Sequence, residues 1–347
     1  MSEIVKGVCN QIATLNIGST NVKVSFDEVI KKYLIKDFLG DEKLLAKLLS
    51  CDVILIRIVS APKYQYQSDI QLIDNDFLLY FATVTNYAPL HNPQTFKIIN
   101  ILHENILKSK KKPKLFGVFD SSFHKNISNA SRMYGINPKL ALKYDLYRHG
   151  YHGLSYSYIN SCLEKTKQYI VCHLGGGSSI CAIKNGVSIA TSMGFGTSDG
   201  LIMVKRAGDI SAEIILFLIR HLNYSYDDVL NMVFNNSGLV GLTGSVFGDD
   251  VKAIVEDNNP LTKNSSNLAI DLYVNSIVNY ISQYYFLLEG SIESIYFTGG
   301  IGENSEIIVK MIMDKILKII PHQKFDIIKT NEELSMKNIY YNNVENG

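Results

Sequence analysis

The sequence carries almost no excess charge of either sign, and this limits its partners. It contains 34 lysine and arginine residues against 33 aspartate and glutamate residues, a net charge of +1. An extended nucleic-acid surface requires a clustered excess of basic side chains. The basic run KSKKKPK, Lys108 to Lys114, is interrupted by Ser109 and Pro113 and is typical of a solvated loop. We therefore expect no nucleic-acid partner.

Paired cysteine motifs, long apolar runs and a signal peptide are also missing. The five cysteines are odd in number and show no CxxC spacing. Cys51, Cys172 and Cys181 lie at or in apolar strand patterns, so we expect buried free thiols in a reducing compartment. No stretch approaches the roughly eighteen apolar residues that a membrane span needs. Met1 to Gln11 carries Glu3 and Lys6 and has no apolar core. These absences predict a soluble cytoplasmic protein without a membrane segment.

Two common nucleotide-binding motifs are absent as well. No GxxxxGK[ST] element occurs. Gly300 and Gly302 follow a strand pattern at Ile295 to Phe297, but the third glycine of the dinucleotide fingerprint is missing at the required spacing. A nucleotide-binding site in this chain would belong to neither class.

A glycine-rich turn lies within the most informative stretch, Tyr169 to Arg206. A strand pattern at Ile170 to Leu174 ends in three consecutive glycines and two serines, and a second strand pattern follows at Ile180 to Ile183. Asn185 and Gly186 then predict a tight hairpin, because both residues tolerate positive φ. Glycine N–H groups are unshielded by Cβ atoms and can point together at one anion. We interpret the triple-glycine turn as a phosphate-holding hairpin.

The same plan occurs near the start of the chain. Ile12 to Asn16 reads as a strand, Gly18 to Asn21 as a turn, and Val22 to Phe26 as a return strand with Lys23 on one face. Two copies of one unit suggest that the chain consists of two related halves.

Two charged residues stand in or beside apolar strand patterns. Asp52 to Val59 reads DVILIRIV, which is typical of a central strand buried on both faces. Arg57 must therefore either pair with a carboxylate or point at an anionic ligand. Asp120 follows the strand pattern Lys114 to Phe119, where α/β folds carry ligand groups. A turn or helix N-cap is the other reading of Asp120.

The segment Tyr147 to Gly153 suits ligand contact more than core packing, because it is dense in polar and aromatic groups. Its histidines, His149 and His152, lack a nearby third His or Cys, so we expect no zinc site. Farther along, helices are expected at Ser211 to Leu222, after Ser225, at Ala269 to Tyr285, and at Glu306 to Ile320 with Ser305 as its cap; Leu239 to Gly244 reads as a connector.

Nine segments carry a family resemblance, and they occur in the family's order: APLHNP at 88–93, VFDSSFH at 118–124, RHGYHGLS at 148–155, CHLGGGSS at 172–179, KNGVSIATSMGF at 184–195, KRAGDI at 205–210, SGLVGLTG at 237–244, FTGGIGENS at 297–305 and TNEEL at 330–334. As an ordered set they resemble the acetate kinase family, within the actin-like, sugar-kinase-like (ASKHA) phosphotransferases. The resemblance covers most of the chain.

The resemblance implies an α/β fold of two ribonuclease-H-like domains with a nucleotide cleft between them. Residues 1–123, completed by a C-terminal helix at 334–347, would form the first domain, and residues 124–333 the second, nucleotide-binding domain. It also implies a homodimer.

The implied activity is the reversible reaction ATP + acetate = ADP + acetyl phosphate, by direct in-line transfer with Mg²⁺ or Mn²⁺. Such transfer mainly requires positioning and charge neutralisation. The catalytic residues would be Arg57, Asp120, His152 and Arg206. Arg57, Val59, Leu90 and Tyr151 would hold the carboxylate substrate, and Asn16 and Glu332 would place the metal. The nucleotide contacts would be Lys23, His173, Leu174, Gly175, Gly176, Gly177, Asp250, Lys252, Gly300, Ile301, Gly302 and Asn304.

The chain departs from the family pattern in several places. The family's HRVVHGG run is here Ile56 to Pro62, which keeps Arg57 but loses both histidines and both glycines. Asn21 replaces a serine, Gly176 an asparagine and Tyr151 a phenylalanine, and the segments 16–57 and 304–330 are shorter. Three alternatives therefore remain: a kinase for propionate or another short-chain acid, a catalytically impaired nucleotide-binding homologue, and a sugar kinase of the same superfamily.

Overall fold

The computed structural model describes residues 11–18, 21–26 and 29–345. The chain divides into two compact units: unit 1 contains residues 1–125 and 331–347, and unit 2 contains residues 126–330. Cys9, the segment 1–10, and Ser19 and Thr20 of the first glycine turn lie outside the described residues. The expected buried thiols at Cys51, Cys172 and Cys181 are confirmed.

Unit 1 is built on a six-stranded mixed sheet of order β3-β2-β1-β4-β6-β5. Its strands are β1 (Ile12–Ile17), β2 (Asn21–Phe26), β3 (Val29–Leu34), β4 (Val53–Ile58), β5 (Ile70–Leu72) and β6 (Lys114–Phe119). The first three form an antiparallel meander, and β1, β4 and β6 run parallel. The apolar β4 is a central strand, as its composition predicts, and its side chains are buried except at Arg57.

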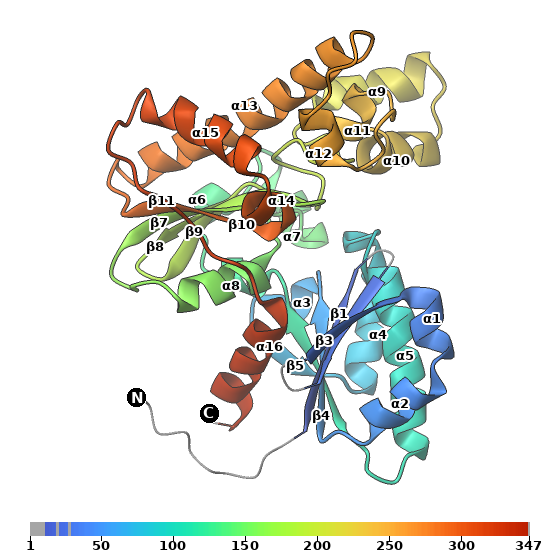
Figure 1. Ribbon diagram of the computed structural model, residues 1–347. Coiled ribbons are helices and arrows are strands. Elements are labelled where there is room, and N and C mark those ends of the chain that lie inside the picture. Colours follow the sequence, from blue (N-terminus) through green and yellow to red (C-terminus); the bar gives the residue numbers. More distant parts are fainter. Residues whose placement is uncertain (1–10, 19–20, 27–28, 346–347) are drawn as a thin grey trace. The chain divides into compact units, whose positions relative to one another are not determined.

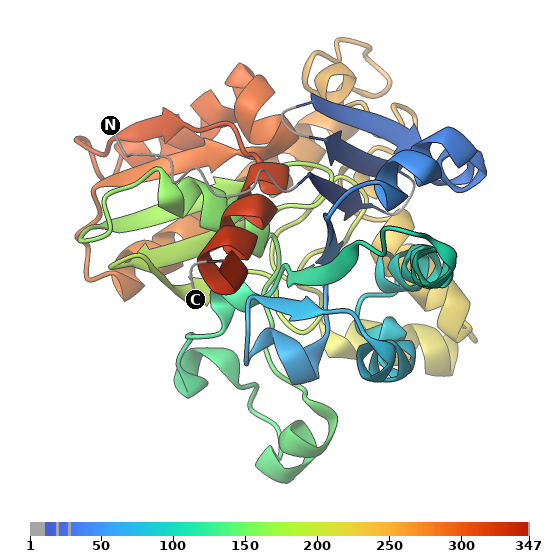
Figure 2. The ribbon, with the colours of Figure 1, turned by 90° about the horizontal axis from the view of Figure 1, so that it is seen from below.

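Helices cover both faces of this sheet (Figure 1). One face carries α1 (Ile35–Gly40), α2 (Glu42–Leu49), α4 (Asn75–Thr83) and α5 (Asn92–Lys108). Their buried residues include Phe38, Leu48, Phe81 and Ile98. Figure 2 shows α4 and α5 side by side, where Phe81 and Phe96 make an edge-on ring contact. On the other face, α16 (Glu332–Tyr340) buries Met336 and sets the Tyr340 ring against Phe116 of β6.

The remaining elements of unit 1 are short: α3 (Pro62–Gln65), η1 (Thr85–Tyr87), η2 (Ser122–His124) and η3 (Tyr341–Glu345). Pro93 stands in the first turn of α5, as predicted, because proline lacks the N–H that this turn leaves unpaired.

Unit 2 repeats the sheet plan of unit 1. Its order is β11-β10-β7-β8-β9. The strands are β7 (Gln168–His173), β8 (Ser179–Lys184), β9 (Val187–Thr191), β10 (Ser294–Thr298) and β11 (Phe325–Ile327). An antiparallel meander, β7 to β9, is again followed by two strands parallel to its first member. Asn185 and Gly186 both have positive φ, 53° and 75°, which confirms the predicted hairpin turn.

Helices flank this second sheet too (Figure 1). One face is covered by α13 (Lys263–Leu287) and α15 (Glu306–Leu317), which share one apolar core with the sheet. The other carries α8 (Gly153–Ser161), with Leu154, Tyr156 and Ile159 buried. The other helices of unit 2 are α6 (Asn129–Arg132), α7 (Pro138–Tyr144), α9 (Ala212–His221), α10 (Tyr226–Asn235), α11 (Gly238–Leu242), α12 (Val251–Val255) and α14 (Gly299–Asn304).

In unit 2, the expected helix starts at Ser211 and after Ser225 are confirmed, and the expected connector at 239–244 is not. Ser211 and Ser225 cap α9 and α10, each accepting a backbone N–H. The expected connector at 239–244 is wrong, because α11 occupies its first part and buries Leu239 and Val240 against the core of α13. Ser305 is the N-cap residue of α15, as expected, although its side chain makes no capping bond.

Within the described ranges, no helix combines the length and the apolarity that crossing a membrane requires.

Candidate active site

Unit 1 holds a buried polar cluster around Arg57 at the end of β4. The Arg57 guanidinium donates to Asp120 Oδ2 at 2.8 Å and to Asn16 Oδ1 at 3.1 Å, and lies 3.5 Å from Glu332 Oε2. Asn16 Nδ2 donates in turn to Glu332 at 2.5 Å and to Glu333 at 3.2 Å. Strands β1 and β4, the end of β6 and the start of α16 thus bring one arginine, one amide and three carboxylates together.

The charges in this cluster bear on the two expectations for Arg57, which are a carboxylate partner or an anionic ligand. Burial alone would lower the pKa of Arg57, but the charges of Asp120 and Glu332 outweigh it and raise this pKa above its usual value. Arg57 is paired with a carboxylate, and Asp120, whose side chain is fully buried, is its partner rather than a helix cap. The three carboxylates exceed the one arginine, so the cluster keeps a negative balance that a cation can offset.

Unit 2 holds a pair of stacked histidines beside the glycine turn. The rings of His152 and His173 lie 4.2 Å apart at an angle of 24°. His152 Nδ1 is 2.9 Å from Ser179 Oγ, which also bonds the Tyr156 hydroxyl. His152 is the N-cap residue before α8 and has a φ of 59°, an uncommon conformation for a residue other than glycine.

The second histidine is held by a matching pair of hydroxyls. His173 Nδ1 is 2.9 Å from Ser155 Oγ, and Thr330 Oγ1 donates to the same serine oxygen at 2.8 Å. Each imidazole therefore has its Nδ1 fixed by a serine that a further hydroxyl contacts. This arrangement fixes the orientation of both rings and directs Nε2 away from the serines.

The glycine turn between β7 and β8 lies directly against Arg206 and His152. A Cβ atom added to Gly177 would be 3.3 Å from both Arg206 Nη1 and His152 Nε2. Arg206 is anchored by the carbonyl of Thr197, to which its Nη1 donates at 2.9 Å. Within the described part of the chain, the N–H groups of Gly176 and Gly177 make no hydrogen bond. Two backbone donors, a histidine and an arginine therefore gather at one turn, as an anion site requires.

The glycine-rich segment after β10 forms the helix α14, and the N–H groups of Gly299, Ile301 and Gly302 in its first turn are already bonded within the protein. Leu174 O accepts from Ile301 N at 2.8 Å and from Gly302 N at 3.1 Å. Gly299 has a φ of 80°, and a Cβ there would lie 2.7 Å from Leu174 O, so only glycine fits. Asn304 donates to Gly300 O. The residues predicted to contact the nucleotide at 174–177 and 300–302 thus adjoin one another, but those helix donors serve packing.

Three of the residues expected to hold the carboxylate substrate, Val59, Leu90 and Tyr151, are buried or half-buried. Val59 is buried and Leu90 is half-buried in unit 1. In unit 2, Tyr151 is buried, and its hydroxyl donates to Phe195 O at 2.6 Å. The hydroxyl that distinguishes Tyr151 from the family phenylalanine is therefore bonded to the backbone.

Lys23, Asp250 and Lys252 are also expected to contact the nucleotide, but they do not belong to either polar cluster. Lys23 is an exposed residue of β2. Asp250 caps α12 by accepting from Ala253 N, and Lys252 of the same helix pairs with Glu256 at 3.8 Å. Across the described ranges, no group of three or more His, Cys, Asp or Glu side chains is arranged to hold a metal ion.

Several members of the two clusters escape sequence reasoning. These are Glu333 beside Asn16, and Ser155, Tyr156, Ser179 and Thr330 beside the histidines. Helix periodicity supplies a signal for two of them, because Ser155 and Tyr156 follow His152 by three and four residues and so lie on its side of α8.

The buried histidine His149 of unit 2 predicts that the stability of the protein depends on pH. Burial and then the charge of Arg132 lower the pKa of His149 to about 3, although the backbone of Asp145 opposes the shift. An unfolded histidine titrates near 6.5, so between about pH 6.5 and about pH 3 only the unfolded state binds the proton. Stability is therefore lost as pH falls through this window. We expect a loss on the order of 2 kcal/mol between pH 7 and pH 5.

Urea unfolding at the two pH values measures this effect. His149→Gln should lose less stability on acidification than the parent protein, whereas the exposed His221→Gln should lose as much. Equal losses in the parent and His149→Gln would show that another group carries the acid sensitivity.

The repeated sheet order defines the class of this protein: it has the actin-like fold of the ASKHA phosphotransferases. The solved structure of a propionate kinase from Francisella tularensis matches it with a TM-score of 0.82 at 26% identity, over 95% of this chain and 98% of that chain. The acetokinase family model matches residues 13–335.

Two relatives bear out the family at the sequence level. The acetate kinase of Mycoplasma genitalium is 34% identical over 331 residues, 91% of this chain and 80% of that protein. The acetate kinase of Mycoplasma pneumoniae is 36% identical over 311 residues, 82% of this chain and 76% of that protein. The chain belongs to the acetokinase family.

Proposed function

We propose that this protein is a carboxylate kinase that transfers the γ-phosphoryl group of ATP reversibly to acetate, giving ADP and acetyl phosphate. The observation that carries the proposal is the set of charged groups in each unit. Arg57 with Asp120, Asn16 and Glu332 suits a carboxylate and a divalent cation. His152, Arg206 and the free N–H groups of the glycine turn suit phosphates. The family membership supports the pairing of these two roles in one reaction.

In unit 1, Arg57 would bind the acetate carboxylate, and Val59 and Leu90 would contact its methyl group. Asp120 fixes the Arg57 guanidinium through a 2.8 Å bond, so the arginine is oriented before the substrate arrives. Orienting a reactant in advance lowers the entropic part of the barrier. Asp120 is thus proposed to act at the acceptor side, mainly by holding Arg57.

The donor types around Asn16 fit Mg²⁺, with Mn²⁺ as the alternative. Mg²⁺ prefers oxygen ligands and keeps several of its waters, so few protein groups suffice. Glu332 offers a carboxylate and Asn16 an amide oxygen, and Asn16 holds Glu332 in place through its own N–H group. A bound cation would neutralise phosphate charge there. Asn16 and Glu332 are the residues that we propose to hold it.

In unit 2, the hydroxyl pairs would set the protonation of the histidines. If Tyr156 donates to Ser179 and Ser179 donates to His152 Nδ1, the proton of His152 resides on Nε2, which lies beside Gly177 and Arg206. We propose that this N–H bonds an equatorial phosphoryl oxygen as charge develops. Thr330 and Ser155 would do the same for His173 along the β- and γ-phosphates.

Hydroxylamine trapping of the acyl phosphate tests the proposal. With ATP, Mg²⁺ and acetate, the protein should form acetohydroxamate at a rate far above an Arg206→Ala control. Propionate belongs in the same assay because a propionate kinase shares the fold. If neither acid gives an acyl phosphate, the result would favour an impaired nucleotide-binding homologue. If ATP is consumed only with hexoses, it would favour a sugar kinase.

Gly176→Asn is expected to lower the Michaelis constant for ATP by about threefold to tenfold. A side-chain amide would add one hydrogen bond to a phosphate, and at this exposed site we take the ordinary net contribution of a hydrogen bond, roughly 0.5–1.5 kcal/mol. The structure has room for it, because a Cβ at the exposed Gly176 would meet nothing within 4 Å. Gly176→Ala is the matched control, since it adds the Cβ without the amide. An unchanged constant would argue against a phosphate at this turn.

We further propose a homodimer formed through α9, whose apolar surface supports it. Leu216 and Phe217 are 64% and 52% exposed, and the helix has no buried residue. Exposed apolar surface of this kind marks association sites. Phe217→Glu should therefore shift the protein to monomer in sedimentation velocity. Phe286→Glu, at a 79% exposed position on α13, is the matched control and should not. A monomeric parent protein would refute the dimer.

A further inference from the structure

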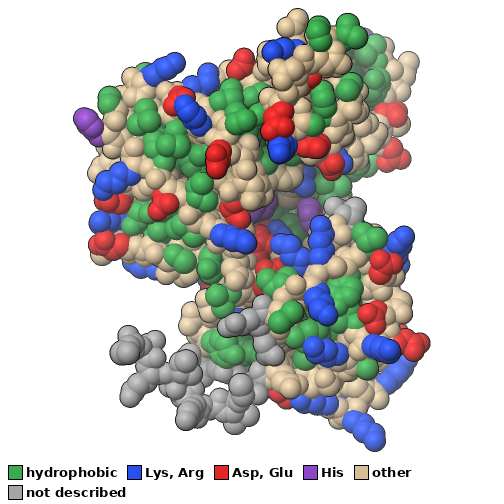
Figure 3. Space-filling view, in the orientation of Figure 1, with side chains coloured by type: hydrophobic (Ala, Val, Ile, Leu, Met, Phe, Trp, Pro, Cys, Tyr) green, Lys and Arg blue, Asp and Glu red, His purple; other side chains and the backbone are tan. Residues whose placement is uncertain are grey.

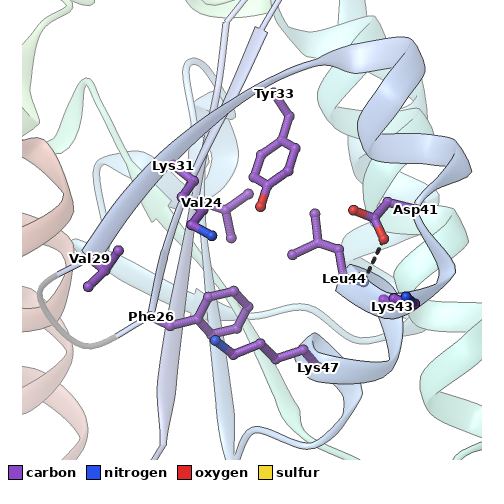
Figure 4. A pocket seen from close by; sticks show the side chains of 9 residues that line it. All are labelled: Val24, Phe26, Val29, Lys31, Tyr33, Asp41, Lys43, Leu44 and Lys47. Carbon is purple, nitrogen blue, oxygen red and sulfur yellow. Dashed lines mark hydrogen bonds between the residues drawn. The ribbon is translucent and has the colours of Figure 1, made fainter.

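A pocket separate from the two polar clusters lies in unit 1 between the edge of the sheet and α2. Its volume is about 390 Å³. Figure 4 shows that β2 contributes Val24 and Phe26, β3 contributes Val29, Lys31 and Tyr33, and α2 with its cap contributes Asp41, Lys43, Leu44 and Lys47. A pocket of this size falls within the range that holds small organic ligands.

The pocket has an apolar floor and a basic rim. Val24 and Leu44 are buried at its base, and the rings of Phe26 and Tyr33 point into it from two sides (Figure 4). Figure 3 shows Lys and Arg side chains gathered over this part of unit 1. Among the lining residues that the structure describes, three are lysines and one is a carboxylate, Asp41, which caps α2 by accepting from Leu44 N at 2.9 Å.

The lysines are placed as an anion site would need them. In the described part of the chain, Lys31, Lys43 and Lys47 form no ion pair. Lys47 Nζ lies 3.9 Å from the centre of the Phe26 ring, a cation–π contact that holds its charge at the pocket wall. Strand alternation places Lys31 on the same face of β3 as Val29 and Tyr33, so it is the charged residue between two apolar ones on that face. Like charges around one cavity repel each other, and a bound anion would reduce that repulsion.

We infer that this pocket binds a small organic phosphate with a flat apolar body. The phosphate would lie among Lys31, Lys43 and Lys47, and the apolar body would contact Phe26, Tyr33 and the floor. The inference does not depend on the carboxylate kinase activity, because none of these residues belongs to the Arg57 cluster.

A different role for Lys31 makes the opposite prediction. β3 is an edge strand, and an inward-pointing charge on an edge strand prevents pairing with a second sheet. In that case Lys31 would protect against association and the pocket would bind nothing. The two roles are separated by a binding measurement on the folded protein.

The probe is phenyl phosphate, titrated calorimetrically into the full chain with saturating ADP and Mg²⁺ present, so that the proposed nucleotide site is filled. We expect saturable binding that Lys31→Met weakens by about tenfold, since a charge-assisted contact is lost. Lys32→Met is the matched control, because it removes the same charge from the opposite face of the same strand. Lys43→Met supplies an independent loss if Lys31→Met does not fold.

Each further outcome decides the matter. Inorganic phosphate should bind more weakly than phenyl phosphate, since it lacks the apolar body. Equal binding of the two probes, equal weakening by Lys31→Met and Lys32→Met, or no saturable binding to the parent protein would overturn the inference. Aggregation of Lys31→Met together with no binding to the parent protein would establish the edge-protection role instead. A repeat without ADP keeps this test independent of whether the chain is a kinase.

Discussion

Arg206→Ala is expected to lower kcat for acetyl phosphate formation by about 10³-fold and to leave the stability of the fold nearly unchanged. An arginine that neutralises a phosphoryl group in transfer contributes at least this much. The structure gives Arg206 the geometry for that role, because its guanidinium lies against Gly177 beside His152 Nε2 and is anchored by Thr197 O at 2.9 Å. Its anchor is a neutral carbonyl, so removing the side chain leaves no buried charge from this bond unpaired.

The neighbouring lysine provides a control for this prediction. Lys205→Ala removes a positive charge one residue away, where the side chain is exposed and pairs with Asp249 at the surface. It should leave kcat within about twofold, since surface ion pairs contribute little. Steady-state rates at saturating ATP and acetate separate the two variants. A loss of less than tenfold in Arg206→Ala would remove this residue from the proposed mechanism.

Arg57→Met is expected to lose both activity and stability, with the free energy of unfolding falling by about 3–5 kcal/mol. The reason is the buried partner. The Asp120 side chain is fully buried and bonded to Arg57 at 2.8 Å, so loss of the guanidinium leaves an uncompensated carboxylate in the core. Glu332 and Glu333 stand close by and add to the unbalanced negative charge.

A second substitution separates the two roles of Arg57. Arg57→Met with Asp120→Asn removes the stranded charge, and it should recover roughly half of the lost stability while the activity stays absent. Urea unfolding gives the stability and hydroxamate formation gives the activity. If the double variant were as unstable as Arg57→Met alone, the Arg57–Asp120 pair would not be the source of the loss. If it regained activity, Arg57 would have no part in binding the carboxylate.

The sequence predicts the local features that a single segment determines. The triple-glycine turn and the Asn185–Gly186 hairpin can be identified from residues that tolerate their backbone conformations. The DVILIRIV run predicts a buried central strand and, within it, an arginine that needs an anionic partner. The structure identifies Asp120 as that partner. β4 and β6 are neighbouring parallel strands, and Arg57 and Asp120 both lie at their carboxyl ends. The repeated strand-turn-strand plan also predicts the repeated sheet.

The remainder depends on contacts between distant segments. Ser179 reaches His152, and Thr330 reaches Ser155 across 175 positions, so neither pair can be identified from spacing. The segment 239–244 reads as a connector because glycine disfavours helices. Tertiary burial of Leu239 and Val240 overrides that preference, and a Cβ at Gly238 would lie 2.1 Å from Met203 O, so the helix must begin at a glycine. The pocket beside α2 likewise arises only when β3 and α2 come together.

Phosphorus NMR of the complete reaction tests the central claim most directly. With the parent protein, ATP, Mg²⁺ and acetate, the γ-phosphate resonance of ATP should decline as an acetyl phosphate resonance grows. When the reaction starts from ADP and acetyl phosphate, the acetyl phosphate resonance should decline as the γ-phosphate resonance of ATP grows. Arg206→Ala should show neither change within the same period. If no acyl phosphate forms from acetate or propionate and none is consumed in the reverse direction, the carboxylate kinase assignment is wrong.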